Sequence, residues 1–334
     1  MTEVERPVLA LRDLTAEMRI SGVDVRLLDR VSFDVPRAGK VALVGESGSG
    51  KTLTALSVMR LLPTYTRTKI SGSVVFLDRD LLELKEREMR CVRGNHIAMV
   101  FQEPATALNP VLKVGYQITE TLHAHRRISK TKARDRAVEL LHMVGIPGPE
   151  QCFDYYPHQL SGGMRQRVVI AIAMSCSPSL IIADEPTTAL DASVEALILD
   201  LFDFAREENG MATLLITHDL GLAATYSHHV VVMYAGQVVE SSSTVALLAN
   251  PLHPYTRALF LSLPSLADCS VRRRDRLSTI DGRVVDLSNR PRGCLFADRC
   301  QDIMALCRDE EPPWFEVERG RGARCWLHGG AAEK

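Results

Sequence analysis

The pattern of hydrophobic and polar positions divides the chain into segments typical of an α/β protein. Apolar runs at 41–44, 180–183 and 213–217 predict buried strands. Residues 8–36 and 70–77 predict shorter β segments that form an antiparallel layer beside this core. Within the first of these ranges, residues 31–35 alternate between apolar and polar, so their odd positions, including Phe33, should face a core.

Helical spacing of apolar residues predicts a mainly helical region between residues 103 and 160. The clearest apolar stripe of this region consists of Ala133, Ala137, Leu140, Leu141 and Val144. It ends before Gly145 and Pro147, residues that typically terminate a helix. Two further helices are expected, over 164–174 and over about 192–208. These stripes are expected to be core positions rather than binding sites.

Length and charge narrow the possible classes of protein. The chain has 334 residues, enough for two domains. Its formal net charge of −1 lacks the excess of positive charge that is typical of proteins that bind nucleic acid. Residues 1–7 are polar and acidic, so no signal peptide is expected there. No uninterrupted apolar run approaches the roughly 20 residues of a membrane-spanning helix. Any path through a membrane would have to come from partner proteins.

A phosphate-binding pattern follows the apolar run at 41–44. Residues 45–52, Gly-Glu-Ser-Gly-Ser-Gly-Lys-Thr, fit the P-loop pattern G-x-x-x-x-G-K-[S/T] at every fixed position. The loop's glycines and serines would bring backbone N–H groups to phosphate oxygens at a helix N-terminus; they are Gly45, Ser47, Gly48, Ser49 and Gly50. Lys51 would reach the β- and γ-phosphates, and the Thr52 hydroxyl would hold Mg²⁺.

A second candidate anion site lies far along the chain at 160–167, Leu-Ser-Gly-Gly-Met-Arg-Gln-Arg. Ser161, Gly162 and Gly163 would present a hydroxyl and bare backbone amides at a helix start. One ATP molecule does not need two such sites. The economical explanation is that the second site meets a nucleotide held by another subunit, and the alternative is an ordinary N-cap at Ser161.

Together these motifs resemble those of the ATP-binding subunit of an ABC transporter. The resemblance implies a P-loop ABC ATPase core with an antiparallel β layer and a helical subdomain, and it extends to the strand that ends in Asp184-Glu185. By resemblance, Asp184 supports Mg²⁺ and Glu185 orients and polarises the attacking water. His218, after the strand at 213–217, is similar to the family's switch histidine, which contacts the γ-phosphate.

The resemblance also assigns two loop residues. Gln102, in Val-Phe-Gln-Glu-Pro, is similar to a glutamine that touches Mg²⁺ and water and reports the nucleotide state to the membrane partner. Asp191, in Ala-Leu-Asp, is similar to the loop that crosses between two ATPase subunits. Hydrolysis would then proceed by positioning and charge neutralisation, without a covalent intermediate. Adenine recognition stays unassigned, because residues 15–32 contain no Phe, Tyr or Trp.

Residues 250–258, Asn-Pro-Leu-His-Pro-Tyr-Thr-Arg-Ala, closely resemble the segment that follows the ATPase domain in oligopeptide, dipeptide and nickel importers. The implied organisation is a nucleotide-binding domain over 1–250, with a helical subdomain over about 103–160, and a C-terminal extension over 251–334. The implied partners are a second, related but non-identical ATPase chain, two membrane permeases and, through these, an extracytoplasmic solute-binding protein. The implied location is the cytoplasmic face of the bacterial plasma membrane.

Four of the eight cysteines lie in the tail: Cys294, Cys300, Cys307 and Cys325. Their spacing matches neither common zinc modules nor standard ferredoxin runs. Members of the same importer branch with a similar tail bind a [4Fe–4S] cluster, so the resemblance implies one here; zinc and reduced structural thiols are the alternatives. The other four are expected to be small buried hydrophobes, namely Cys91, Cys152, Cys176 and Cys269.

The sequence therefore predicts an ATP-hydrolysing importer subunit with ATP, Mg²⁺ and a [4Fe–4S] cluster as cofactors. Two other functions stay open: an ABC ATPase without a transport role, and an iron–sulfur sensor that uses ATP as a conformational input.

Overall fold

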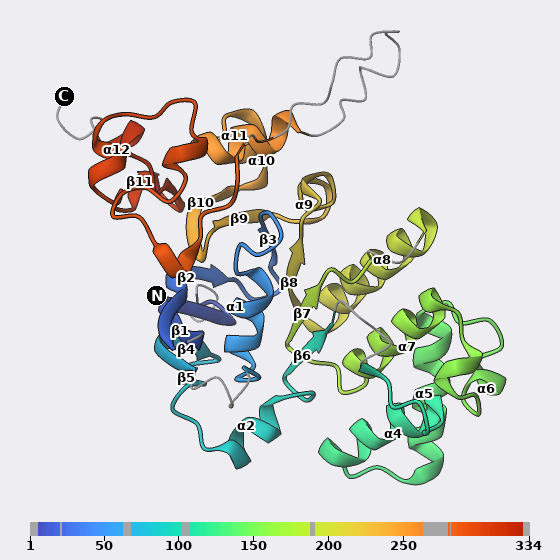
Figure 1. The fold of residues 1–334 in the computed structure, drawn as a ribbon. Helices are drawn as coiled ribbons and strands as arrows, with labels where there is room; N and C mark the ends of the chain where they lie inside the picture. The colour runs from blue at the N-terminus through green and yellow to red at the C-terminus, as the bar shows by residue number, and fades with distance from the viewer. Residues whose placement is uncertain are drawn as a thin grey trace, which may run out of the picture. The chain divides into compact units, whose positions relative to one another are not determined.

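The computed structural model describes residues 6–20, 22–62, 68–101, 107–187, 191–262, 280 and 282–329, and its elements are labelled in Figure 1. The chain forms two compact units that alternate along the sequence. Unit 1 comprises Met1–Leu9, Val35–Lys40 and Phe76–Ile216. Unit 2 comprises Ala10–Asp34, Val41–Val75 and Thr217–Lys334.

Unit 1 is built around three parallel strands in the order β8-β7-β6. They are β6 (Ile97–Val100), β7 (Leu180–Asp184) and β8 (Ala212–Thr217). Every residue of all three strands is buried. Strands covered on both faces have no polar side, which explains why the sequence shows continuous apolar runs here rather than alternation.

The predicted helical region is confirmed within unit 1. It contains α4 (Val114–His125), α5 (Lys130–Met143), α6 (Pro149–Cys152) and the short 3₁₀ turn η3 (Pro157–Gln159). Figure 1 shows α4 and α5 beside α7 (Gly162–Met174), which both helices contact. The stripe on α5 is buried as expected. Unit 1 also contains α2 (Glu86–Val92) and α8 (Ala192–Asn209), the latter within one residue of its predicted end.

Unit 2 contains a sheet with the strand order β11-β12-β10-β9-β3. Its β3 (Lys40–Val44) is parallel to β9 (His229–Tyr234), and β10 (Gln237–Ser243) is antiparallel to β9. The C-terminal strands β12 (Arg321–Ala323) and β11 (Phe315–Glu318) continue the sheet from β10. The last part of the chain therefore extends the same sheet as the strand that leads into the P-loop.

A second sheet of unit 2 carries the N-terminal strands in the order β2-β1-β4. They are β1 (Leu9–Ile20), β2 (Val23–Val35) and β4 (Lys69–Phe76), in the two segments where the sequence predicts strands, and the two-residue β5 (Arg79–Asp80) follows them in the chain. In β2 the alternation is confirmed, because Val31, Phe33 and Val35 are buried while Ser32 and Asp34 are exposed. The remaining long element, α1 (Lys51–Val58), begins at the end of the P-loop.

The C-terminal segment, meaning the described residues from 251 to 329, packs into the core of unit 2. One hydrophobic cluster joins Ala42 and Val44 of β3 to Tyr255 of α11 (Pro254–Leu261) and to Leu295 and Phe296. The other short elements of unit 2 are α9 (Leu220–Tyr226), α10 (Thr244–Ala249), η5 (Leu287–Asn289), η6 (Ala297–Arg299), α12 (Leu306–Asp309) and η7 (Trp326–His328). No helix in the described ranges is both long and apolar enough to cross a membrane.

Candidate nucleotide site

The P-loop in unit 2 has a backbone that requires glycine at two of its turns. Gly45 has φ +154°, and a Cβ placed there would lie 2.2 Å from the carbonyl oxygen of Met233. Gly50, the residue before α1, has φ +104°, and its Cβ would lie 2.9 Å from Leu28 Cδ2. The loop therefore passes close to β2 and to the end of β9, and at Gly45, where the neighbour is a backbone oxygen, only glycine allows that approach.

Polar groups of the P-loop are gathered at the start of α1. Lys51 is buried, and its Nζ donates to the carbonyl oxygens of Gly45 (2.7 Å) and Glu46 (2.9 Å). Ser49 Oγ is buried and has no hydrogen-bond partner among the described residues, whereas Ser47, Gly48 and Thr52 are exposed. An ammonium, an unsatisfied hydroxyl and the first-turn amides of a helix suit an anion such as a phosphate chain. The residues present thus fit ATP.

The predicted carboxylates lie at the carboxyl end of β7 in unit 1. Asp184 is the last residue of the strand and is 2% exposed. Glu185 follows it, is half-buried and has φ +47°, an uncommon backbone conformation for a residue with a side chain. Its N–H donates to the carbonyl oxygen of Ile216 on β8 (2.9 Å). The strained turn therefore leads the chain out of the sheet at the residue predicted to act on water.

The Ser-Gly-Gly motif begins α7, also in unit 1. Ser161 is the N-cap, and its side-chain oxygen accepts a hydrogen bond from Met164 N (3.2 Å). Ser161 and Gly162 are exposed, and a Cβ added to Gly162 would meet no atom within 4 Å. Gln166, one turn along α7, donates from Nε2 to the carbonyl oxygen of Pro186 (2.9 Å). The structure therefore connects this helix to the segment directly after Glu185.

The remaining predicted residues occupy separate positions. Asp191 is the N-cap of α8 and accepts from Ser193 N (3.1 Å) and Val194 N (3.0 Å). His218 is exposed directly after β8, in unit 2. Gln102 lies outside the described residues. The structure therefore groups 45–52 with His218 in unit 2, and Ser161, Gly162, Gly163, Asp184, Glu185 and Asp191 in unit 1.

The four tail cysteines line one small apolar cavity, together with His253 and Trp326. Burial raises the pKa of Cys294 to about 12 and that of Cys300 to about 11, so both thiols are neutral at neutral pH. The cavity holds about 10 Å³, room for one water molecule at most. In the parts of the chain that the structure describes, no group of three or more His, Cys, Asp or Glu side chains is arranged to hold a metal ion.

The predicted [4Fe–4S] cluster therefore has no support in the structure. Four irons and four sulfides need far more room than this cavity has. The arrangement matches the alternative of reduced structural thiols. Of the other cysteines, Cys152 and Cys176 are buried as predicted, Cys91 is exposed, contrary to prediction, and Cys269 lies outside the described residues.

Sequence reasoning missed three residues in unit 2: Glu46 of the P-loop, and Tyr255 and Arg299, which both form hydrogen bonds with Glu46. Glu46 occupies a variable position of the P-loop pattern. Tyr255 lies in the segment that resembles importer subunits, but no sequence signal connects it with residue 46. Arg299 is one of several arginines in the tail, so nothing in the pattern distinguishes it.

Comparisons with known proteins agree with this geometry. Residues 28–188 match the family described as ABC transporter, and residues 239–307 match the oligopeptide/dipeptide transporter C-terminal region. The chain is 47% identical to a probable peptide ABC transporter ATP-binding protein, y4tR, of Sinorhizobium fredii, over 96% of this chain and 94% of that protein. It is 43% identical to the oligopeptide transport ATP-binding protein OppD of Bacillus subtilis, over 96% of this chain and 88% of OppD.

Among solved structures, the dimeric ATP-binding cassette MJ0796 in a post-hydrolysis state with ADP and Pi has a TM-score of 0.64 and 28% identity to this chain. The match covers 71% of this chain and 98% of that one. It supports a P-loop ABC ATPase fold with mixed α/β sheets. Because it contains a P-loop and aligns with these relatives along nearly its whole length, the chain belongs to the ATP-binding subunits of ABC transporters, in the oligopeptide/dipeptide branch.

Proposed function

We propose that this protein hydrolyses ATP to energise the import of peptides through partner permease subunits. The observation that carries the proposal is the P-loop itself, in which Lys51, the unsatisfied Ser49 hydroxyl and the first-turn amides of α1 form an anion site. Relatives that align along nearly the whole chain are named for peptide import and oligopeptide transport, which supports peptides as the substrate class. Those names do not favour an ABC ATPase without a transport role or a sensor.

In this proposal the P-loop binds the phosphates of ATP, with Lys51 at the β- and γ-phosphates. Thr52 and Asp184 would hold Mg²⁺, with Gln102 as a further contact. The metal would neutralise negative charge on the phosphates. The exposed Thr52 hydroxyl at the first turn of α1 and the buried Asp184 at the end of β7 support these roles. Oxygen ligands of this kind are the ones Mg²⁺ prefers.

Glu185 orients and polarises the attacking water, and His218 contacts the γ-phosphate. The backbone of Glu185 supports its role, since strained conformations persist where the surrounding structure enforces them, often at active sites. The reaction needs no covalent intermediate, because phosphoryl transfer to water is catalysed mainly by positioning and electrostatic stabilisation.

Ser161, Gly162 and Gly163 serve the ATP held by a second ATPase subunit, and Asp191 lies in the loop that crosses between the two subunits. The exposure of Ser161 and Gly162 supports this assignment, as does the dimeric structure of MJ0796. We propose that the second subunit is a related, non-identical chain. The helical subdomain over about 103–160 would face two permeases. The protein would lie on the cytoplasmic face of the plasma membrane. A solute-binding protein would act on the other side of that membrane, through the permeases. The domain boundary near residue 250 belongs to the same proposal.

The catalytic assignment is tested by two substitutions in the transporter assembled in lipid vesicles. Glu185→Gln should lower ATP turnover at least about 100-fold while ATP stays bound, because only the group acting on water is changed. Lys51→Ala should weaken ATP binding itself. The matched control is Glu207→Gln on the exposed end of α8, which should hydrolyse ATP at the wild-type rate. Wild-type turnover in Glu185→Gln would remove this residue from its role.

The assignment of Ser161 is tested by Ser161→Arg, compared with Ser129→Arg. Both serines are N-caps whose side chains accept one backbone N–H, from Met164 and Lys132 respectively, so both variants lose a cap. Ser161→Arg should leave ATP binding to the isolated chain intact and abolish turnover in the complex, whereas Ser129→Arg should retain turnover. Loss of ATP binding by isolated, folded Ser161→Arg would show that the serine acts within its own subunit.

A further inference from the structure

Every polar group of the P-loop residue Glu46 is engaged by the surrounding structure. Its N–H donates to Tyr255 Oη (2.8 Å). Its carboxylate accepts two hydrogen bonds from Arg299, Nη1 to Oε2 (2.7 Å) and Nη2 to Oε1 (2.9 Å). Its carbonyl oxygen accepts from Lys51 Nζ (2.9 Å) and from Ser49 N (3.1 Å). Two of the four groups that hold Glu46 thus come from the C-terminal segment.

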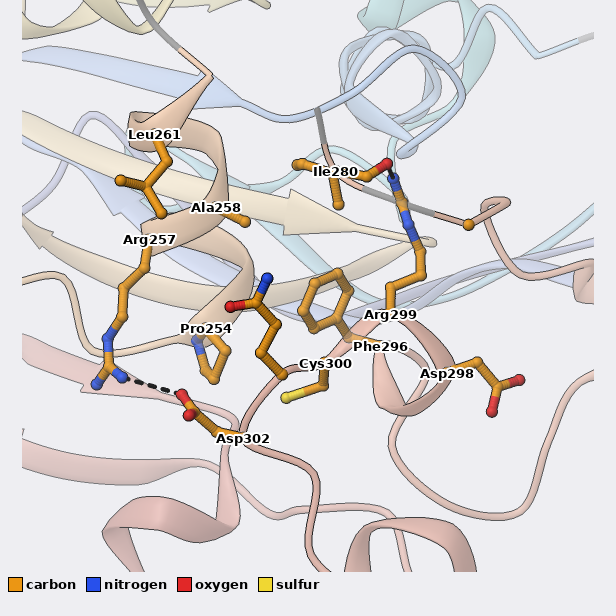
Figure 2. A pocket seen from close by; sticks show the side chains of 12 residues that line it. Pro254, Arg257, Ala258, Leu261, Ile280, Phe296, Asp298, Arg299, Cys300 and Asp302 are labelled. Carbon is orange, nitrogen blue, oxygen red and sulfur yellow. Dashed lines mark hydrogen bonds and ion pairs between the residues drawn. The ribbon is translucent and has the colours of Figure 1, made fainter. Parts of the chain in front are cut away.

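Arg299 is almost fully buried, with 5% of its side chain exposed. Its guanidinium lies 5.8 Å from the Tyr234 ring centroid and 5.9 Å from that of Phe296. Figure 2 shows the side chain directed toward Ile280, whose carbonyl oxygen accepts from Nη2 (3.3 Å). A bidentate pair of this kind is directional, so it fixes the orientation of the Glu46 carboxylate as well as its charge.

Tyr255 is held as firmly as Arg299. Its side chain is fully buried, and its ring packs against Tyr234 (centroids 4.8 Å apart) and Phe296 (5.3 Å). Its backbone N–H donates to His253 Nδ1 (3.0 Å) at the start of α11. The His253 N–H in turn donates to the buried carboxylate of Glu240 on β10 (2.8 Å). The Tyr255 hydroxyl is therefore presented to the P-loop by a helix start that is anchored to the sheet.

We propose that Tyr255 and Arg299 are positioning residues of the ATP site: they hold Glu46, and through it the P-loop backbone, in the conformation that binds phosphate. The inference rests on the proposed role of the P-loop, and it assigns to the C-terminal segment a part in nucleotide binding. Glu46 follows Gly45 directly, and the carbonyl oxygens of these two residues hold the Lys51 ammonium. A shift of Glu46 therefore moves the principal cation of the site.

The strength of the effect follows from burial. Removing Arg299 leaves the partly buried Glu46 carboxylate, 27% exposed, without its partner, and the side chain can then turn toward water and move the groups around it. The groups that can move here are the P-loop residues, since Arg299 and Tyr255 are packed among aromatic rings. Displacements of about 1 Å at a binding site cost large factors in function.

The test measures the affinity of the full-length, wild-type chain and its variants for Mg²⁺-ATP by calorimetry, together with their melting temperatures. Arg299→Gln should raise the Kd about tenfold and Tyr255→Phe about fivefold, within the usual range of coupling between two sites. The matched control is Arg321→Gln. Arg321 is also largely buried in the C-terminal segment (11% exposed), pairs with Glu318 and donates to the carbonyl oxygen of Asn250. This variant should lose stability and keep the wild-type Kd.

A double variant separates positioning from general loosening. If Arg299 acts through Glu46, then Glu46→Ala and Arg299→Gln together should weaken ATP binding no more than the stronger single variant does. Additive losses would show that Arg299 does not act through Glu46 and would overturn its assignment. An equal loss of affinity in Arg321→Gln would also overturn the proposal, because it would indicate general loosening.

Two conservative variants keep the test decisive if Arg299→Gln does not fold. Tyr255→Phe removes a single oxygen and keeps the packed ring. Arg299→Lys keeps the charge but cannot form the bidentate pair, so it should recover folding without recovering the affinity. Wild-type affinity in both variants, measured beside a wild-type chain that binds ATP, would refute the positioning role while leaving the P-loop's own role in place.

Discussion

The P-loop and the cysteine cavity lie in the same unit, yet they offer opposite environments. The P-loop presents backbone amides, an ammonium and an unsatisfied hydroxyl at the start of α1. The cavity presents thiols and apolar side chains, and burial raises the pKa of Cys294, Cys300 and Cys325. The first environment suits a charged ligand, whereas the second suits the small hydrophobic core of a segment with few large apolar residues.

The two regions are joined along the chain by adjacent residues. Cys300 lines the cavity, and Arg299 beside it reaches the Glu46 carboxylate. His253 lines the cavity as well, and it supports the start of the helix that carries Tyr255. The cavity therefore matters to the nucleotide site as the support of two positioning residues, even though it binds no phosphate itself.

The largest expected effect concerns thiol reactivity. Because only the thiolate reacts and burial raises the pKa of Cys294 to about 12, its alkylation at pH 8 should be about a thousandfold slower than that of an ordinary thiol. The rate should rise about tenfold per pH unit up to pH 11. Time-resolved labelling with mass spectrometry measures it, with the exposed Cys91 as the internal reference.

Metal analysis of the same sample completes this test. Rapid labelling of Cys294 and Cys300 in the folded chain would contradict the neutral-thiol assignment. About four iron atoms per chain in an anaerobic preparation, lost in Cys300→Ser, would also contradict the neutral-thiol assignment and would support the [4Fe–4S] cluster.

The second effect concerns the backbone of the P-loop. In Gly45→Ala the new Cβ would lie 2.2 Å from the Met233 carbonyl oxygen, so the loop must move, and ATP affinity should fall about 100-fold. Gly48→Ala is the matched control. That Cβ meets no atom within 4 Å, although φ is +77°, so its loss should stay below about tenfold. Equal affinities for the two variants, measured by calorimetry, would show that the close approach at Gly45 does not shape the site.

These contrasts also explain which features the sequence could predict. The P-loop, the ends of β7 and β8 and the N-cap at Ser161 are encoded by neighbouring residues, so their local structure follows from a short pattern. The same holds for α5 and α8, whose stripes and stop signals lie within single segments.

Features that depend on distant parts of the chain cannot be predicted from local patterns. The ion pair between Glu46 and Arg299 joins residues 253 positions apart, and no local pattern specifies it. The pairing of β12 with β10 was not foreseen for the same reason. The cysteine spacing left metal and structural thiols open, because the choice depends on cavity size and on burial, which tertiary packing determines.

The third effect concerns acid stability at the junction of the two regions. Burial, with smaller effects of His328 and Arg257, lowers the pKa of His253 from 6.5 to about 3. Since the folded-state pKa is lowered, the unfolded chain binds more protons as the pH falls below 6.5, and stability should decrease. Between pH 7 and pH 5 the loss should be about 2 kcal/mol. His253→Asn, which keeps a side-chain acceptor at the N-cap, should lack this dependence.

Tryptophan fluorescence reports the relevant region, because both tryptophans of the chain, Trp314 and Trp326, lie in the C-terminal segment. Urea unfolding curves at pH 7 and pH 5 give the free energies of unfolding. Equal acid sensitivity of the wild type and His253→Asn would assign the loss to other groups.

The smallest effect links the cavity to the nucleotide. Gly293→Ala would place a Cβ 2.2 Å from the Cys307 carbonyl oxygen, which accepts the hydrogen bond from Cys294 N, and this clash should loosen the cavity wall. Because Arg299 directly precedes Cys300, which lines the cavity, ATP affinity should fall about threefold, somewhat below the ordinary range of site-to-site coupling. Faster alkylation of Cys294 confirms that the wall has loosened. If labelling accelerates while the Kd for ATP stays at the wild-type value, then the cavity does not support the P-loop, and the position of Arg299 does not depend on the cavity.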